Sequence, residues 1–292
     1  MKISYKAAAL TAASLFVLNA CVPEGSQSTS AVSSINVPDS VIAEQRANLA
    51  TATASDGTGP QAPRDLASAV GTNPKVFPFA PPYTSMNSCN IHFHESAEHR
   101  GGQFTKYAGN GDGKGTGTGF KYSGDLTAAE LAPIDKKIGA GKTGDLAPGD
   151  TIEVHYVHTT APITPGPTLG SCLTEEVSDP FLRVETQVMV LVNDPNALSF
   201  VELARVENVN GLYQAPNISS TSGTPIQYLG STTGPKYNEE GSPFKVTWSV
   251  RPNVIKVDVN SVDAWFSDNV FAEDHAHGVR NLVTNPALLS RF

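Results

Sequence analysis

Positive charge is scarce in this sequence, and its scarcity limits the partners that the protein can have. The 292 residues include 20 Lys and Arg against 28 Asp and Glu, which gives a formal net charge of −8. A chain with this balance lacks the excess of cations that binds nucleic acid phosphates without regard to sequence. We therefore expect no nucleic acid partner.

Long runs with the period of an amphipathic helix are also scarce, whereas 25 Gly, 21 Pro and many Thr and Val residues favour short strands joined by turns. Strand-like runs between turn residues occur at 90–94, 151–160, 185–192, 200–206, 244–250 and 254–259. This pattern predicts a mainly β fold (β-rich α+β).

The apolar stretch at residues 7–18 is too short to span a membrane comfortably, and two lysines precede it, so residues 1–20 have the features of a secretory signal peptide. The stretch ends in Leu-Asn-Ala-Cys, which resembles the lipobox of bacterial lipoproteins, where the cysteine, here Cys21, carries the lipid. Because Val22 follows rather than Asp, the resemblance implies, for a Gram-negative bacterium, an outer-membrane lipoprotein that faces the periplasm or the cell surface. The alternative is an ordinary signal peptide with an incidental cysteine.

Residues 21–75 are rich in Ser, Thr, Ala, Gly and Pro and show no sustained periodicity. This composition predicts a disordered tether that holds a domain away from the membrane, with one short helix at 41–50. The folded domain is expected at 76–292, and its contact with the membrane is expected only through the lipid anchor.

Cysteine is scarce, with three residues in the chain. Once Cys21 is assigned to lipid, Cys89 and Cys172 remain in a protein outside the cytoplasm, where an even pair most simply forms a disulfide. The competing interpretation makes Cys89 a metal ligand. It is disfavoured because strand alternation puts position 89 on the face opposite His92, and because the histidines already complete a site.

Motifs for several common chemistries are absent or incomplete. The Gly-Lys-Thr at 141–143 has Lys136 where a phosphate-binding loop needs a glycine, and residues 109–119 lack the ligand spacing of a calcium loop. Both stretches are expected to be surface turns. The His-Glu-x-x-His motif of many zinc hydrolases does not occur.

Histidines at alternating positions predict a metal site. In the strand-like run 90–94, residues two apart share a face, so Asn90, His92 and His94 point the same way. Two imidazoles at that separation can converge on one ion, although a His-x-His pair alone is a weak signal.

A second run, 151–158, adds the third imidazole. Glu153, His155 and Val157 share one face, while His158 points to the other. Three neutral histidines with an open fourth position are typical of catalytic zinc, because structural sites fill all four positions with protein ligands. Without thiolate ligands zinc is the expected metal, with Co²⁺ or Cd²⁺ as possible substitutes.

Two segments resemble the metal site of carbonic anhydrases: HFHESAEH at 92–99 and EVHYVH at 153–158. Alpha-class enzymes share these motifs, and the longer strings CNIHFHESAEHRGG and GDTIEVHYVHTT are most similar to the delta class. The resemblance extends from about Cys89 to about Val283. It implies a lyase in which zinc-bound hydroxide attacks carbon dioxide to give bicarbonate and a proton. It also implies a large, twisted, mostly antiparallel central sheet with short peripheral helices.

The resemblance further implies residues that orient the zinc ligands. Asn90 and Glu153 match the alpha-class side chains that hydrogen-bond the first and the third ligand histidine. His99 follows Glu98 directly and is expected to belong to the same hydrogen-bond network.

The resemblance implies catalytic roles for Glu98 and Thr232. Glu98 matches a buried glutamate that accepts a hydrogen bond from a threonine, and the threonine in turn orients the attacking hydroxide. The segment Tyr228-Leu229-Gly230-Ser231-Thr232-Thr233 is one residue shorter than the matching alpha-class motif. Thr232 is therefore the first choice and Thr233 the alternative.

Val246 and Trp248 match positions that line an apolar pocket for carbon dioxide, and Val157, on the metal face of its strand, is expected to join them. His158 is expected to be a core histidine.

A second His-x-His, His275 and His277, fits a loop-positioning or proton-shuttle role better than metal binding, and no residue matches the alpha-class proton shuttle. Two other functions stay open, a zinc-dependent esterase or hydrolase and a non-enzymatic zinc-binding surface lipoprotein.

Overall fold

The structure, a computed structural model, describes residues 36–54, 57–68, 70–139, 141, 145–231 and 238–291. They belong to one compact unit, residues 34–292. The signal peptide and Cys21 lie outside the described residues and remain predictions. No helix in the described part of the chain is long and apolar enough to cross a membrane.

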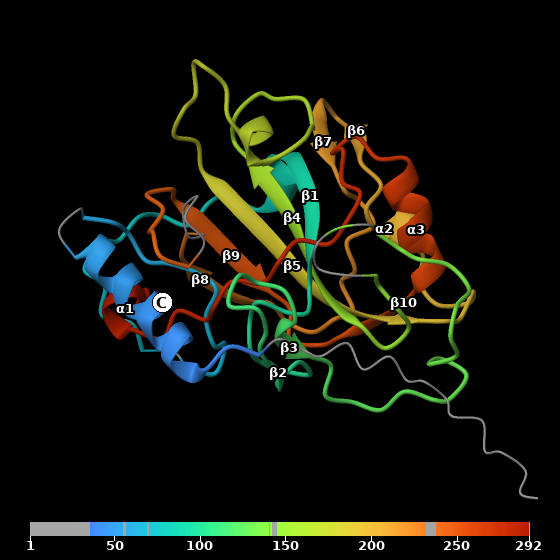
Figure 1. Ribbon diagram of the computed structural model, residues 1–292. Coiled ribbons are helices and arrows are strands. Elements are labelled where there is room, and N and C mark those ends of the chain that lie inside the picture. The colour runs from blue at the N-terminus through green and yellow to red at the C-terminus, as the bar shows by residue number, and fades with distance from the viewer. Residues whose placement is uncertain are drawn as a thin grey trace, which may run out of the picture. The chain divides into compact units, whose positions relative to one another are not determined.

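A six-stranded sheet forms the centre of this unit (Figure 1). Its strands are β1 (Asn87–Glu95), β4 (Thr151–Thr159), β5 (Leu182–Val192), β9 (Val246–Val250), β8 (Ile226–Leu229) and β10 (Ile255–Asp258). The order is β1-β4-β5-β9-β8, and β10 pairs with the end of β5. The β1–β4, β4–β5 and β8–β9 pairs are antiparallel, whereas β9 and β10 run parallel to β5. The prediction of a mainly β fold with a mostly antiparallel sheet is confirmed.

Short elements surround the sheet. Two small hairpins are formed by β2 (Lys106–Asn110) with β3 (Thr118–Lys121) and by β6 (Glu207–Val209) with β7 (Leu212–Gln214). Three single-turn 3₁₀ helices are η1 (Tyr83–Ser85), η2 (Leu169–Cys172) and η3 (Pro286–Leu288).

Both faces of the sheet are covered, and alternation decides which side chain lies on which face. One face, which includes Ile91, packs against α2 (Phe200–Leu203) and α3 (Val259–Ser267). The other face includes Val157 and Trp248. Each residue of β4 is buried, as expected for a strand between two covered faces. The predicted ligand histidines lie on the Val157 face.

The strand predicted at 200–206 is wrong, because Phe200–Leu203 is helical. Phe200, Leu203 and Ala204 are all buried. Their i, i+3 and i+4 spacing is that of one helix face, whereas a strand buried on one side would require alternation.

The predicted tether at 21–75 is too long, because its second half is folded. The helix predicted at 41–50 exists as α1 (Asp39–Thr53), which is longer at both ends. Leu49 of α1 is 4% exposed and forms a small hydrophobic cluster with Val283, Leu288 and Leu289. The folded unit therefore begins well before residue 76.

Polar contacts also attach α1 to distant segments. Gln45 donates to the carbonyl of Gly113 at 2.7 Å, and Arg46 donates to the carbonyl of Leu282 at 3.1 Å. Gly113 belongs to the β2–β3 turn, so part of the predicted surface turn at 109–119 is covered by α1.

The predicted disulfide between Cys89 and Cys172 is confirmed, and Cys89 is therefore not a metal ligand. The argument from strand alternation, one of the two against a ligand role for Cys89, is wrong, however. The ladder between β1 and β4 shifts register between Ser88 and Asn90, so Cys89 is the extra residue of a β-bulge. Cys89 packs in the same cluster as Val157, on the face that strict alternation denied it.

Candidate metal centre

Pairing of β1 with β4 brings the predicted ligand residues together. His92 lies directly opposite His155, and His94 lies opposite Glu153. Ring nitrogens of His92, His94 and His155 all lie within 4.8 Å of one another. Two strands of one antiparallel ladder thus place three imidazoles on one face of the sheet.

His92 and His94 are each hydrogen-bonded through Nδ1 to an oxygen atom of the protein. Nδ1 of His92 lies 2.6 Å from Oδ1 of Asn90, and Nδ1 of His94 lies 2.8 Å from the carbonyl oxygen of Gly278. Because these oxygens accept, each Nδ1 donates, and the neutral rings present Nε2 as the acceptor. Asn90 occupies the orienting position inferred from sequence. The role of Gly278 was missed, since a backbone carbonyl has no sequence signature.

His155 is hydrogen-bonded to an oxygen atom of the protein through Nε2 rather than through Nδ1. Nε2 lies 2.8 Å from Oε1 of Glu153, so Nδ1 is the nitrogen presented to the cluster. This Nδ1 lies 3.3 Å from Nε2 of His92. Tetrahedral zinc bound at roughly 2.0–2.1 Å places its ligand nitrogens about 3.3 Å apart, so the separation suits one shared ion.

Two of the three rings have the charge state that a metal requires. Burial, together with the neighbouring His155, lowers the pKa of His92 well below its usual value, and burial lowers the pKa of His94 to about 3. Both rings are therefore neutral at pH 7, the ligating form. Nε2 of His94 is buried and has no hydrogen-bond partner among the described residues, although buried acceptors are normally satisfied. A metal ion bound at this point would satisfy it.

Glu153 connects His155 to a second buried histidine. Its carboxylate accepts from the backbone N–H of His99 at 3.0 Å and from Nδ1 of His99 at 2.7 Å. On the far side, Nε2 of His99 lies 2.6 Å from the hydroxyl of Tyr228. Burial alone raises the pKa of Glu153, but its contacts with His99 and His155 lower it well below the usual value. A continuous buried network therefore runs from Tyr228 to a ligand ring.

Glu98 is fully buried and accepts hydrogen bonds from an arginine that the sequence did not single out. The backbone N–H and Nε of Arg280 donate to Oε1 at 2.9 and 3.1 Å, and Nη2 donates to Oε2 at 3.3 Å. Burial raises the pKa of Glu98, but Arg280, with smaller contributions from His94 and His155, lowers it to about 2. Thr232 and Thr233, the predicted partners of Glu98, lie outside the described residues.

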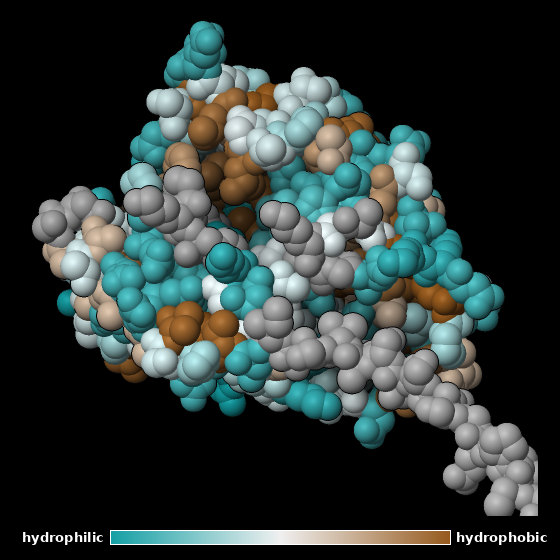
Figure 2. Space-filling view, viewed as in Figure 1, coloured by the Kyte–Doolittle hydropathy of each residue, from teal (hydrophilic) through white to brown (hydrophobic). Residues whose placement is uncertain are grey.

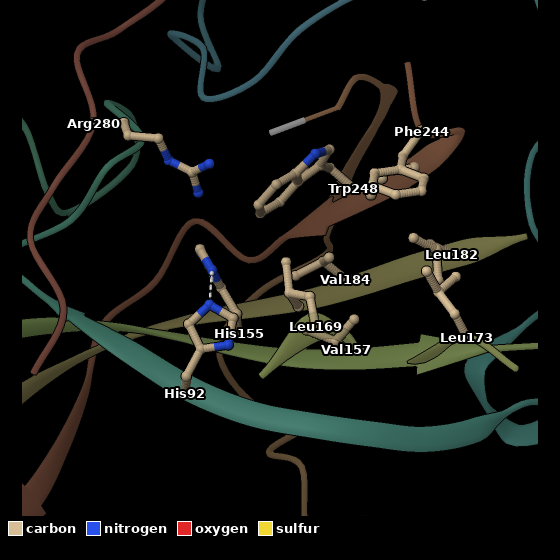
Figure 3. A pocket seen from close by; sticks show the side chains of 11 residues that line it. His92, His155, Val157, Leu169, Leu173, Leu182, Val184, Phe244, Trp248 and Arg280 are labelled. Atoms are coloured by element: carbon tan, nitrogen blue, oxygen red, sulfur yellow. Dashed lines mark hydrogen bonds between the residues drawn. The ribbon is translucent and has the colours of Figure 1, made fainter. Parts of the chain in front are cut away.

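An apolar pocket opens beside the histidines. The described residues that line it are His92, His155, Val157, Leu169, Leu173, Leu182, Val184, Phe244, Val246, Trp248 and Arg280 (Figure 3). Figure 2 shows hydrophobic surface inside a hollow near the beginning of β5. The structure thus brings the three predicted pocket residues, Val157, Val246 and Trp248, to one cavity. Leu169 of η2 also lines this cavity, which the local sequence motifs did not indicate.

Comparison with known proteins agrees with these motifs. A family model described as delta carbonic anhydrase matches residues 83–261. The chain belongs to the delta carbonic anhydrase family. The match includes both ligand strands and the disulfide.

Other similarities to this delta carbonic anhydrase are weak. No curated protein matches the chain. An alpha-carbonic anhydrase from Thermovibrio ammonificans in complex with the inhibitor sulfanilamide is 14% identical, with coverage of 76% of this chain and 84% of that chain and a TM-score of 0.27. Photobacterium profundum alpha-carbonic anhydrase is 16% identical, with coverage of 79% and 89% and a TM-score of 0.26.

The second His-x-His of this carbonic anhydrase lies next to the first. The backbone of His277 forms a β-bridge with His94, and its ring centroid lies 5.3 Å from that of His92. Nε2 of His277 lies 2.7 Å from a carboxylate oxygen of Glu273. The residue is not in the three-histidine group.

His275 lies farther out, with its ring 5.5 Å from that of His277 and Nδ1 2.5 Å from Asp274. His158 lies on the opposite face of β4, buried beside Tyr83, with Nδ1 3.0 Å from the carbonyl of Tyr156. Neither residue joins the metal cluster.

Proposed function

We propose that the chain binds one zinc ion through His92, His94 and His155 and catalyses the reversible hydration of carbon dioxide. The observation that supports this most directly is the orientation of the three rings. In each ring one nitrogen is hydrogen-bonded to a protein oxygen, and the other nitrogen faces the neighbouring histidines. One of these remaining nitrogens, Nε2 of His94, is buried and has no hydrogen-bond partner among the described residues. Cobalt or cadmium can replace zinc with such ligands.

Zinc, when bound, supplies a hydroxide nucleophile near neutral pH, an effect for which carbonic anhydrase is itself the standard example. The protein contributes position and surroundings. Asn90, Gly278 and Glu153 fix the tautomers and orientations of the three ligands. The apolar walls, including Val157 and Trp248, favour a small nonpolar substrate over water next to the ligands.

We further propose that Thr232, or Thr233, orients the nucleophile as the family resemblance implies. Support comes from Tyr228, which precedes both threonines, is buried and is hydrogen-bonded to His99. The segment that leads to these threonines therefore begins at the buried hydrogen-bond network of His99 and Glu153. Thr232→Ala and Thr233→Ala, compared with wild type at equal zinc content, test the assignment. The orienting threonine is the one whose loss lowers kcat/KM strongly.

Stopped-flow hydration of carbon dioxide, measured before and after zinc is removed with a chelator and then restored, tests the main proposal. We expect activity that disappears with the metal and returns with it. Full zinc binding without hydration would instead support a zinc-binding lipoprotein. No metal-dependent hydration at all overturns the proposed reaction.

A zinc-dependent esterase is a second candidate, because the pocket is wider than carbon dioxide needs. Leu169, Leu173, Leu182 and Phe244 extend the apolar wall beyond the three residues next to the ligands. A zinc-supplied nucleophile also attacks esters. Hydrolysis of a chromogenic acetate ester, measured on the same metal-loaded and metal-free samples, decides whether this activity accompanies or replaces hydration.

Export and lipidation at Cys21 are proposals as well. The disulfide between Cys89 and Cys172 supports an oxidising compartment, such as the periplasm or the cell surface. Mass spectrometry of the N-terminal peptide from the membrane fraction should find a lipidated Cys21, and Cys21→Ser should release the protein from that fraction. An unmodified Cys21 in a soluble mature protein contradicts the anchor.

A further inference from the structure

One ligand histidine, His94, is oriented by a loop outside the sheet strands. Its Nδ1 lies 2.8 Å from the carbonyl oxygen of Gly278 and 3.5 Å from Oε1 of Glu98, so the carbonyl is the nearer acceptor. The other two ligands are oriented by residues two positions earlier on their own strands. A β-bridge between His94 and His277 attaches the chain just before Gly278. The position of the carbonyl therefore also depends on what holds the chain after it.

The turn between β2 and β3 and the helix α1 both contact the chain after Gly278. The backbone N–H of Val279 donates to the carbonyl of Gly115, in that turn, at 2.9 Å. A β-carbon added to Gly278 would lie 3.4 Å from backbone atoms of Gly115, so the loop and the turn pack directly on each other. From α1, Arg46 donates to the carbonyl of Leu282 at 3.1 Å.

The side-chain amide of Gln45, in α1, joins the turn to the loop. Its Nε2 donates to the carbonyl of Gly113 at 2.7 Å, and its Oε1 accepts from Nδ2 of Asn281 at 2.6 Å. These two hydrogen bonds form a bridge from Gly113 through Gln45 to Asn281, the Gln45 bridge. Asn281 is also fixed from a second direction, because its backbone N–H donates at 2.7 Å to Oδ1 of Asn238, a residue that is 4% exposed.

We propose that Gln45 is a positioning residue for the metal centre, because its amide joins the β2–β3 turn to the chain after Gly278 and so fixes the carbonyl that orients His94. The inference rests on the proposed function, in which His94 is a zinc ligand. With the carbonyl fixed, Nδ1 of His94 keeps the proton and Nε2 stays available for the metal. Both α1 and residues 278–282 lie outside the region 83–261 that the family model matches, so the Gln45 bridge adds to the motif that the family shares.

The tautomer of His94 in metal-free protein tests this role without turnover. Long-range ¹H–¹⁵N spectra distinguish Nδ1–H from Nε2–H, and His94 of the wild type should carry its proton on Nδ1. Gln45→Leu removes both hydrogen bonds of the bridge at similar side-chain size, and should move part of the His94 population to the Nε2–H form. His92, whose Nδ1 is hydrogen-bonded to Asn90, should keep its tautomer in the same spectra.

Zinc affinity measures the consequence for the metal centre. Gln45→Leu should raise the zinc Kd, measured by competition with a chromophoric chelator, by about threefold to tenfold, because Gln45 acts on the ligand through another group. Leu49→Ala is the matched control, since it weakens the apolar packing of the same helix and touches neither hydrogen bond of Gln45. Its zinc Kd should stay within about twofold of wild type.

Asn281→Ala breaks the Gln45 bridge from the other end and serves if Gln45→Leu does not fold. It should reproduce both effects, and the double variant should raise the zinc Kd no more than about twofold beyond the larger single effect, because the two residues act as one unit. An unchanged His94 tautomer or an unchanged zinc Kd in both single variants overturns the inference. Equal effects of Leu49→Ala and Gln45→Leu also overturn it, because α1 would then contribute stability alone.

The two readouts separate this inference from the proposed function. A His94 tautomer that depends on Gln45, in a protein that does not hydrate carbon dioxide, contradicts the proposed function alone. Metal-dependent hydration by a protein whose His94 tautomer does not depend on Gln45 contradicts the positioning role alone.

Discussion

His92 and His155 lie opposite each other across the β1–β4 ladder, with Nε2 of the first 3.3 Å from Nδ1 of the second. The two rings present different nitrogens because Asn90 engages Nδ1 of His92, whereas Glu153 engages Nε2 of His155. The nitrogen that each ring presents to the other is therefore set by the residue two positions earlier on the same strand. This relationship makes the ligand set sensitive to single substitutions on either strand.

The first prediction concerns the ligands. His155→Ala should abolish stoichiometric zinc binding and carbon dioxide hydration, because two imidazoles cannot hold a catalytic zinc against a chelator. Zinc content by elemental analysis, together with stopped-flow activity, measures this. His158→Ala, three residues along β4 on the opposite face, should keep zinc at full occupancy even if stability falls. Loss of zinc in both variants, or in neither, contradicts the face assignment.

The second prediction concerns the network behind His155. Glu153→Gln should weaken zinc affinity by about tenfold to a hundredfold, because the carboxylate that orients His155 is lost. Tyr228→Phe removes only the hydroxyl that contacts His99, one hydrogen bond farther from the metal, and should weaken zinc affinity by less. Competition with a chromophoric chelator gives both affinities. A larger effect from Tyr228→Phe than from Glu153→Gln is incompatible with a network that acts through Glu153.

The third prediction is a pH dependence that comes from Glu95. Burial, and then repulsion by Asp150, raises the pKa of Glu95 to about 7, and Lys121 opposes this. The carboxyl group is protonated more readily in the folded chain than in the unfolded one. Its stabilising contribution is therefore complete below pH 4.5 and is lost as the pH rises through about 7.

Glu95→Gln removes this dependence, because an amide does not titrate in that range. Relative to the variant, metal-free wild type should lose about 1–3 kcal/mol of unfolding free energy between pH 5 and pH 8. Urea unfolding at several pH values measures the difference, and metal-free samples keep zinc affinity out of the comparison. Parallel pH profiles for wild type and Glu95→Gln would show that Glu95 titrates normally.

The fourth prediction concerns α1. Leu49→Ala should lower the free energy of unfolding by about 2–4 kcal/mol, because Leu49 is buried against Val283, Leu288 and Leu289. Glu44→Ala changes an exposed position on the same helix and should cost less than about 0.5 kcal/mol. If the two variants cost the same, α1 does not belong to the folded unit.

Local pattern was enough to predict the ligand strands. The alternation in Asn90–His94 and Glu153–Val157 indicates which side chains share a face, since β4 is buried along its whole length and β1 along most of it. The same rule failed at Cys89, where a bulge adds one residue. A bulge depends on pairing with β4, whose Val157 lies 68 positions after Cys89, so no pattern within β1 reveals it.

Contacts made by distant segments were the main features that the sequence did not predict. Arg280 and Gly278 reach the site from near the C-terminus, and neither belongs to a recognisable motif. The region of α1 has the composition of a linker, and only its contacts with distant segments, with Gly113 and with residues 282–289, show that it is folded. The run 200–206 was short and apolar, a case in which helix and strand are hard to separate by periodicity.

The packing of α1 against the C-terminal segment also limits how far the enzyme can move from its anchor. If Cys21 is lipidated as proposed, the linker to Asn36, where the described residues begin, is 15 residues long and spans at most about 50 Å when fully extended. A linker that continued to residue 75 would allow more than about three times that reach. The catalytic unit is then confined to a thin layer next to the lipid surface, where carbon dioxide that crosses the membrane first meets water.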